Sequence, residues 1–367
     1  MKITFVLKGD FEILPPVLPR LLYFAQKNIE CRLICTNISN SNRTLFESHC
    51  VDVYTTCHKR KLLGRRNKIL DWSGFRRACK NILSKRLNNS DFLYICSADT
   101  ALALGRFFMK TPYVFQSNEL YDQLPLYKNG IKKYALNAKV FVVPEYCRAN
   151  VCAFWYGLNK IPFVVPNIPY VLSRERNLPI SDLKAREALV KLQNKRIVLY
   201  QGHISADRTL NSIAEALCQM NDDRCVLVLM GTDRSGAVKE ICKRYKNTIH
   251  IPFVTPPMHL EITSHAHIVV LSYDRVSMNN IFCAPNKIYE YSCYGIPMIG
   301  NDIPGLRYTV QANHMGVCAA YEDIASIVAA FKKIDDNYDC YRMNANKFFD
   351  ENYLGEYLDR LLNELMN

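Results

Sequence analysis

Polar side chains gather in residues 272–305, between an apolar strand-like run and a predicted helix that begins near Lys287. The N–H groups of a helix N-terminus attract anions, and a lysine beside them adds positive charge. Glu290 lies one turn into this helix, where a carboxylate can accept both vicinal hydroxyls of a ribose. The stretch therefore indicates a nucleotide site, with an ordinary first-turn acid as the alternative interpretation of Glu290. The candidate residues are Asn279, Asn280, Asn286, Lys287 and Glu290.

A second anion-binding pattern follows the apolar run at residues 196–200. Gly202 permits a tight turn after that run, and His203 comes next. Arg208 falls in the first turn of the following helix, where a cation opposes the helix dipole unless an anion lies beside it. We therefore expect Arg208 to contact a phosphate, the alternative being an exposed arginine. Neither GxGxxG nor GxxxxGK[ST] occurs, which disfavours a dinucleotide cofactor and a P-loop ATPase.

Other kinds of chemistry find weaker support in the sequence. His259, His265 and His267 are close enough in sequence to suggest zinc, but no fourth ligand is suitably spaced, so we predict no metal site. The GxSxG elbow of a serine hydrolase does not occur. In the first half of the chain, Glu119 and Asp122 are the best acidic candidates for binding an acceptor. A pair of acids at the start of a helix is the alternative interpretation.

The elements that position these residues alternate between apolar strands and helices, which is typical of parallel sheets covered on both faces. Strands are expected at residues 3–7, 31–37, 92–96, 113–116, 140–144 and 163–167, and again at 196–202, 225–231, 249–253, 267–272 and 297–301. Helices are expected at residues 16–28, 99–108, 209–220, 237–245 and 353–366. Ligands of such sheets bind beyond the carboxyl ends of the strands.

The fold class predicted from this alternation is α/β, with two Rossmann-like doubly wound domains that face each other across a cleft. Residues 166–182 contain three prolines and are the candidate linker. The predicted domains are 1–168 and 169–345. We expect residues 346–367 to form a C-terminal helix that packs back on the first domain.

Length and composition describe a globular chain of 367 residues, 49% hydrophobic and 22% charged, which excludes disordered and collagen-like proteins. No apolar run approaches the roughly 18 residues that span a bilayer. The N-terminus lacks the pattern of a secretory signal, so a cytoplasmic protein is expected. The 15 cysteines are scattered, and we expect them to be reduced.

The net charge of +13 is concentrated in residues 1–170, which carry 25 basic and 11 acidic residues. Residues 59–86 hold eleven basic residues and one acid, Asp71, interleaved with apolar residues. Three interpretations are a solvated helix face, contact with an anionic membrane or lipid-linked ligand, and nucleic-acid binding. The second is favoured. No nucleic-acid recognition module accompanies the charge, so a nucleic-acid partner is not expected.

The segment PNKIYEYSCYGIPMIGNDIPG (285–305) resembles the donor-site motif of glycosyltransferase family 4, whose members are retaining enzymes of the GT-B fold. NNIFCAPNKIYEY (279–291) looks especially like a bacterial subset that builds surface polysaccharides such as capsule or lipopolysaccharide. YQGHISADRTL (200–210) is similar to the family's glycine loop and basic phosphate ligand. The resemblance covers most of the chain and is most specific over residues 196–320.

The resemblance implies a metal-independent glycosyltransferase without a cofactor, which moves a sugar from a nucleotide-sugar to a saccharide acceptor. Glu290 would bind the ribose, and Arg208 with Lys287 and the N–H groups near Asn286 would stabilise the departing nucleoside diphosphate. Gly9 would let the loop after the first strand approach the diphosphate. Gly202 and His203 would belong to the glycine loop.

Three departures from the family pattern affect the expected contacts with the sugar. Phe282 stands where members commonly carry an acid, so Asn279 or Asn280 would take over hydroxyl contacts. Asn118 stands where a histidine is common and would hydrogen-bond the sugar. His203 stands where an arginine is often found, which leaves Arg208 as the main basic ligand.

The function expected from the sequence is therefore retaining sugar transfer in surface polysaccharide synthesis. The acceptor would be a saccharide, lipid-linked in view of the basic first half, and the enzyme would contact the anionic inner face of the membrane peripherally. One alternative is a nucleotide-sugar epimerase of the GT-B fold. Another is a catalytically silent partner that binds nucleotide-sugar or scaffolds a synthase.

Overall fold

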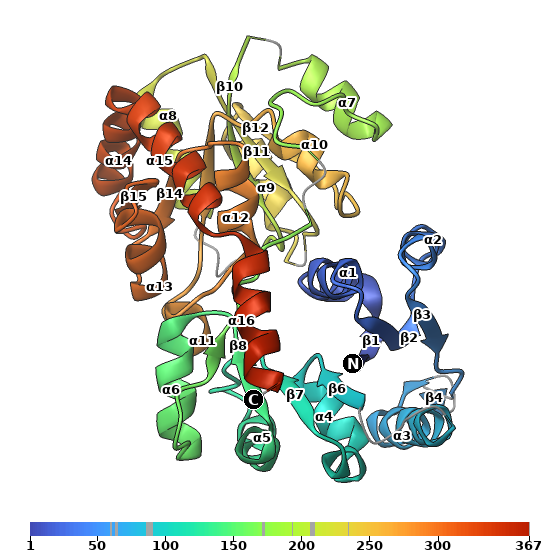
Figure 1. Cartoon of the computed structure of the whole chain (residues 1–367). Coiled ribbons are helices and arrows are strands. Elements are labelled where there is room, and N and C mark those ends of the chain that lie inside the picture. The colour runs from blue at the N-terminus through green and yellow to red at the C-terminus, as the bar shows by residue number, and fades with distance from the viewer. Residues whose placement is uncertain are drawn as a thin grey trace. The chain divides into compact units, whose positions relative to one another are not determined.

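Two units make up the computed structural model of the chain (Figure 1). The first contains residues Met1–Tyr170 and Leu354–Asn367, and the second contains Val171–Tyr353. The structure describes residues 1–58, 61–62, 65–85, 91–170, 173–192, 194–205, 210–233 and 235–366.

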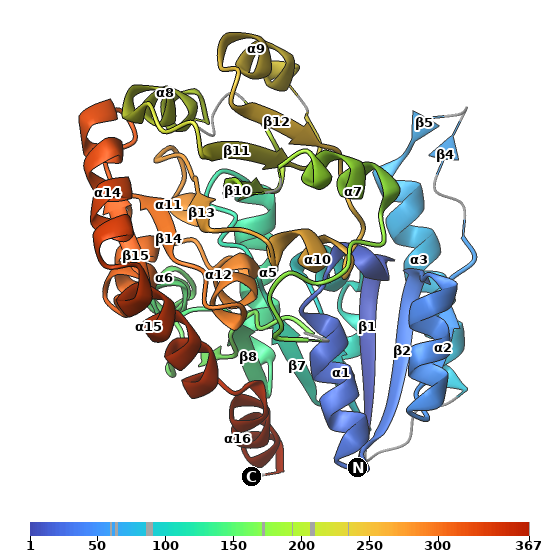
Figure 2. The same cartoon turned by 90° about the horizontal axis from the view of Figure 1, so that it is seen from above.

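The first unit is built on a seven-stranded parallel sheet of order β3-β2-β1-β6-β7-β8-β9. Its strands are short apolar runs, and those at the centre are buried on both faces, as parallel strands between helices must be. β1 and β2 lie side by side (Figure 2), with Ile3 paired to Cys31. The strands are β1 (Lys2–Asp10), β2 (Glu30–Asn37), β3 (Asp52–Thr55), β6 (Asp91–Ile95), β7 (Tyr113–Gln116), β8 (Val140–Val143) and β9 (Phe163–Val164).

Four helices of the first unit begin where a polar side chain accepts a hydrogen bond from a free N–H group of the first turn. The acceptors are Ser39, Asn67, Ser97 and Glu145. The helices are α1 (Val17–Gln26), α2 (Asn40–Ser48), α3 (Lys68–Ser84), α4 (Ala98–Leu104), α5 (Pro125–Asn137), α6 (Tyr146–Tyr156) and α16 (Leu354–Met366), with 3-10 turns η1 (Phe11–Ile13) and η2 (Phe107–Lys110). The short strands β4 (Lys61–Leu62) and β5 (Arg65–Arg66) pair with each other.

The second unit is built on a six-stranded parallel sheet of order β12-β11-β10-β13-β14-β15. The strands are β10 (Arg196–Gln201), β11 (Cys225–Met230), β12 (Thr248–Ile251), β13 (Ile268–Leu271), β14 (Met298–Asn301) and β15 (Gly316–Ala319). The helices are α7 (Leu183–Val190), α8 (Leu210–Met220), α9 (Ala237–Arg244), α10 (His259–Thr263), α11 (Met278–Ile281), α12 (Asn286–Cys293), α13 (Pro304–Leu306), the π-turn η4 (Arg307–Gln311), α14 (Ile324–Asp336) and α15 (Tyr338–Glu351).

Each sheet has one point where the strand order reverses. In the first sheet it lies between β1 and β6, and in the second it lies between β10 and β13. The loops that leave the carboxyl ends of these neighbouring strands run to opposite faces of the sheet, which opens a crevice for a ligand. These two places are therefore where ligands are expected.

The predicted fold class is confirmed by the two parallel sheets with their connecting helices. The helix predicted at residues 99–108 is in fact α4 followed by the 3-10 turn η2. At the other end of the chain, α16 packs against α1, and Lys27 pairs with Asp359 at 3.2 Å. Among the residues described, no helix is both long and apolar enough to cross a bilayer.

Residues 65–85 of the strongly basic segment include helix α3. Its residues Phe75, Cys79 and Leu83 recur every four positions and are fully or almost fully buried in the first unit. That apolar stripe therefore packs within the protein. Ile69 is different, since 81% of its surface is exposed.

Candidate functional site

Glu290 is buried in the second unit, where side chains from three elements meet. It lies on α12 with only 6% of its surface exposed. Gln201, the last residue of β10, donates from Nε2 to Glu290 Oε2 at 2.8 Å. Gln201 Oε1 in turn accepts from Thr263 Oγ1 of α10, also at 2.8 Å. This chain of hydrogen bonds holds the carboxylate at the reversal point between β10 and β13.

His259 is a further neighbour of the Glu290 carboxylate. Its Nε2 lies 3.4 Å from Glu290 Oε2. Burial by itself would raise the pKa of Glu290, but His259, Gln201 and Lys287 outweigh burial, and the pKa is lowered. Both close contacts use Oε2, so among the described residues Oε1 of Glu290 has no hydrogen-bond donor. An ionised carboxylate with one oxygen available is suited to accept hydroxyl groups of a ligand.

Lys287 lies directly against the backbone that follows β10. Gly202 has a φ of +135°, and a Cβ atom built there would lie 2.6 Å from Lys287 Nζ. The Nζ atom is also 5.6 Å from the centroid of the Tyr200 ring. The Tyr200 hydroxyl donates to the carbonyl of His203 at 2.7 Å and so fixes the turn. Gly202 is thus needed for a cation to lie beside this strand end.

The asparagines predicted for this site have different environments. Asn286 is the first residue of α12 and is half-buried, at the helix end that attracts anions. Asn279 is half-buried on α11. Asn280, also on α11, donates from Nδ2 to Asp274 at 2.9 Å, so its amide group stabilises the loop before α11. Phe282 ends this short helix.

The remaining predicted site residues lie in the first unit or outside the described residues. Gly9, with a φ of +138°, donates its N–H to Thr36 Oγ1 at 2.9 Å. Asn118 follows β7; its Oδ1 accepts from Gln116 at 2.6 Å, and its buried Nδ2 has no partner among the described atoms. Asp122 is half-buried in the following loop. Arg208 falls in the segment 206–209, outside the described residues.

Glu119 forms an ion pair with Arg148, at 3.5 Å from the Nη1 atom, and half of its side chain is exposed.

The three histidines considered for zinc each have a different partner. His259 faces Glu290, while His265 Nε2 lies 2.8 Å from the carbonyl of Leu178 and His267 Nε2 lies 3.7 Å from Asp335. No group of residues suited to a metal ion occurs in the part of the chain that the structure describes.

Sequence reasoning missed Gln201, Thr263 and the pairing role of His259. Gln201 and Glu290 are 89 positions apart, and Gln201 and Thr263 are 62 apart. A polar residue at the last position of an otherwise apolar strand was the available signal for Gln201, because such a side chain stands at the ligand-binding edge. No pattern in the sequence indicates that Gln201 contacts Thr263.

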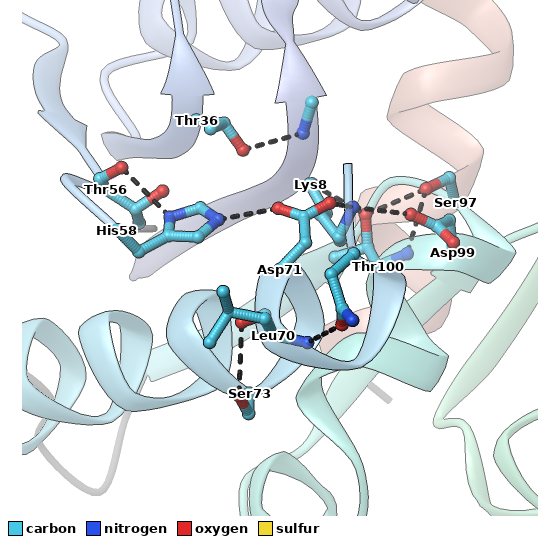
Figure 3. Close-up of polar contacts among 12 residues, drawn as sticks. Lys8, Thr36, Thr56, His58, Leu70, Asp71, Ser73, Ser97, Asp99 and Thr100 are labelled. Carbon is cyan, nitrogen blue, oxygen red and sulfur yellow. Dashed lines mark hydrogen bonds and ion pairs between the residues drawn. The ribbon is translucent and has the colours of Figure 1, made fainter. Parts of the chain in front are cut away.

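A second buried polar cluster lies in the first unit, and sequence reasoning missed it as well. Asp71 of α3 accepts from Lys8 Nζ at 2.8 Å and lies 2.8 Å from His58 Nε2 (Figure 3). Lys8 is also 3.0 Å from Asp99. Lys8, Asp71 and His58 expose at most 7% of their side chains. The cluster lies at the reversal point between β1 and β6, because Lys8 belongs to β1 and Asp99 follows β6.

Replacing Asp71 by asparagine should destabilise the first unit by about 2 kcal/mol at pH 7, because Lys8 and His58 lose a charged acceptor. Burial would raise the pKa of Asp71, but hydrogen bonds from Lys8 and His58 lower it below 3.8. Such a carboxylate stabilises the fold above its unfolded pKa and loses this contribution as the pH falls through its folded pKa.

The destabilisation by Asp71→Asn should therefore shrink below about pH 4. Urea unfolding of both proteins from neutral to acidic pH measures it. A difference in unfolding free energy that is constant with pH would contradict the assigned charge of Asp71.

Comparisons with known proteins agree with this architecture. HepE from Anabaena, solved in complex with UDP, superposes with a TM-score of 0.70 at 12% identity, covering 100% of both chains. Sucrose-phosphate synthase from Thermosynechococcus elongatus superposes with a TM-score of 0.72 at 14% identity, covering 99% of both. The fold is GT-B.

The glycosyltransferase WaaG, involved in lipopolysaccharide biosynthesis, shares the GT-B fold with a TM-score of 0.65 at 10% identity over 98% of each chain. Residues 195–337 match the family model of glycosyl transferases group 1. That range contains the Glu290 site with all three of its partners. No curated protein matches the chain by sequence.

Proposed function

We propose that this protein is a glycosyltransferase that takes a sugar from a nucleotide-sugar donor. The observation that carries the proposal is the buried Glu290, whose pKa is lowered by its neighbours and which is held at the reversal point of the second sheet with Lys287 three residues before it. Both lie in the segment that matches glycosyl transferases group 1. UDP in the solved structure of HepE supports a nucleoside diphosphate as the common ligand.

Each group has a distinct task in this proposal. Glu290 Oε1 accepts the ribose hydroxyls, and Gln201 and His259 keep the carboxylate ionised and oriented. Lys287 and the N-terminus of α12 stabilise the negative charge that grows on the diphosphate as the glycosidic bond breaks. Arg208 is assigned to the same phosphates on the basis of the sequence.

The acceptor and the stereochemistry complete the proposal. We assign retention of the anomeric configuration, with the acceptor hydroxyl entering on the face that the diphosphate leaves, and no metal is required because cations of the protein stabilise the leaving group. The acceptor is a saccharide, lipid-linked at an anionic membrane that the protein contacts peripherally, in surface polysaccharide synthesis. The resemblance of residues 279–291 to that subset and the basic first half of the chain support this.

A catalytically silent partner that binds nucleotide-sugar is the second candidate function. The observation that favours it is the presence of Phe282 and Asn118 where the family commonly has an acid and a histidine. Incubation with UDP-glucose and other nucleotide-sugars distinguishes the two. Release of the nucleoside diphosphate supports the enzyme, whereas binding without release under any acceptor supports the silent partner.

Replacing Lys287 by alanine should weaken UDP binding about tenfold to a hundredfold while leaving uridine binding unchanged, because only the diphosphate contacts the ammonium group. Isothermal titration of both ligands measures the ratio of the two affinities. Lys239→Ala, an exposed lysine of α9, is the matched control and should change neither. An unaltered UDP-to-uridine affinity ratio in Lys287→Ala would remove Lys287 from the phosphate site.

A further inference from the structure

A cavity of about 340 Å³ opens in the first unit, beside the cluster of Lys8 and Asp71. Its walls come from β1, α3, α4 and α5, at the reversal point between β1 and β6. Such a position is where an open parallel sheet binds ligands. The lining residues are Lys8, Lys68, Asp71, Trp72, Asp99 and Tyr127.

The charges around the cavity balance, and the pairing of Lys8 with two carboxylates disfavours charged ligands. Lys8 Nζ lies between Asp71 Oδ2 at 2.8 Å and Asp99 Oδ2 at 3.0 Å, so its charge is already neutralised. A phosphate would meet both carboxylates, and a metal ion would meet the ammonium group between them. The polar wall therefore favours a neutral ligand that both donates and accepts hydrogen bonds.

Asp99 is the acceptor most accessible to such a ligand. Its side chain is 31% exposed, against 5% for Asp71. The Tyr127 hydroxyl donates to Asp99 Oδ1 at 2.5 Å, and Lys8 binds Oδ2, so the carboxylate is held rigidly. Each carboxylate oxygen has a second lone pair, which leaves Asp99 able to accept ligand hydroxyls.

The other wall of the cavity is aromatic. The rings of Trp72 and Tyr127 meet nearly edge to face, with centroids 6.4 Å apart. The exposed Lys68 places its Nζ 5.0 Å from the Trp72 ring and 4.5 Å from the Tyr127 ring. The face of an aromatic ring carries partial negative charge, so it attracts the Lys68 ammonium group. For the same reason it can attract the C–H groups on one face of a sugar ring. Trp72 Nε1 is buried and donates to no described atom.

We propose that this cavity binds a neutral sugar ring of the acceptor, with Asp99 accepting its hydroxyls and Trp72 packing against its C–H face. The proposal rests on the proposed function, since it names the acceptor group of that reaction. Asp71 is a positioning residue, because it holds Lys8 and so Asp99. Neither Glu119 nor Asp122 lines the cavity.

The two tryptophans of the chain, Trp72 and Trp155, make a direct test possible. Trp155 lies on α6, outside the cavity, and also carries a lysine over its ring, with Lys128 Nζ 3.7 Å from the centroid. In Trp155→Phe all tryptophan fluorescence therefore comes from Trp72, and in Trp72→Phe it comes from the matched control Trp155. The probes are methyl glucoside and methyl galactoside as neutral sugars, and glucose 6-phosphate as an anion.

We expect a saturable fluorescence change with at least one neutral methyl hexoside in Trp155→Phe and no change in Trp72→Phe. The titration extends to about 100 mM, enough to detect weak binding by a single ring. Adding Asp99→Asn to Trp155→Phe should weaken the affinity at least about tenfold, since an amide replaces the charged acceptor. Adding Lys80→Ala, which removes an exposed lysine of α3 outside the cavity, should leave it within about twofold.

Several outcomes would overturn the proposal. No fluorescence response to any neutral hexoside would do so, and so would tighter, salt-sensitive binding of glucose 6-phosphate that is lost in Lys68→Ala. UDP titration of the same variants separates this result from the donor site. If UDP binds and no hexoside does, the cavity assignment fails alone. If a hexoside binds and UDP does not, the cavity is a sugar site, but the proposed function and the acceptor role of that sugar fail.

Discussion

Replacing Glu290 by glutamine should weaken the binding of UDP and of uridine together, each about a hundredfold. The substitution keeps the size of the side chain but removes the charge and turns one oxygen into a donor. Each hydrogen bond between a ribose hydroxyl and a charged acceptor contributes about 1.5–3 kcal/mol, so the loss of a charged acceptor has a large effect. Titration calorimetry of both ligands measures the affinities.

This pattern differs from that of Lys287→Ala, which should affect UDP but not uridine. Glu240→Gln is the matched control, because Glu240 is an exposed acid in the first turn of α9 and should have no effect. The unfolding temperature without ligand verifies that Glu290→Gln remains folded. If Glu290→Gln bound uridine as tightly as the unmodified protein, Glu290 would not be the ribose ligand.

Replacing Gly231 by alanine should destabilise the second unit by about 4 kcal/mol, from backbone strain and a steric overlap together. Gly231 has a φ of +143°, and a Cβ atom there would lie 1.8 Å from the carbonyl oxygen of Gly202. The ends of β10 and β11 therefore touch backbone to backbone. Since Gly202 also lies against Lys287, the displacement should weaken UDP binding as well.

Replacing Gly236 by alanine measures the cost of backbone strain without a steric overlap. Gly236 has a φ of +76°, but a Cβ atom there would meet no atom within 4 Å, so only about 1 kcal/mol should be lost. Thermal unfolding followed by calorimetry compares the two variants. An equal decrease in the unfolding temperature would show that the close approach at Gly202 has no energetic consequence.

The acceptor side of the proposed reaction is organised differently from the donor side. At the β10/β13 reversal a buried carboxylate lies beside a lysine, a combination suited to a ribose and a diphosphate. At the β1/β6 reversal the lysine is neutralised by two carboxylates, and aromatic rings form the second wall. In the proposed reaction, the same fold position therefore binds a charged ligand in one unit and a neutral one in the other.

The pattern of apolar runs was sufficient to predict the architecture, because a parallel strand between helices must be apolar along its length. CVLVLM of β11 is buried at every position, and the chain signals this without any knowledge of its neighbours. The Glu290 motif was also recognisable, since Asn286, Lys287 and Glu290 are close together in the chain and a helix N-terminus is a local feature.

The network around that motif could not be read in the same way. Gln201, Thr263 and His259 are common residue types with no local pattern, and they reach Glu290 only because parallel strands bring their carboxyl ends to one edge. Lys8 and Asp71 are 63 positions apart, and no local pattern in the basic segment around Asp71 pairs the two. Local order follows from nearest neighbours along the chain, whereas the partner of a buried charge depends on which distant strands pair.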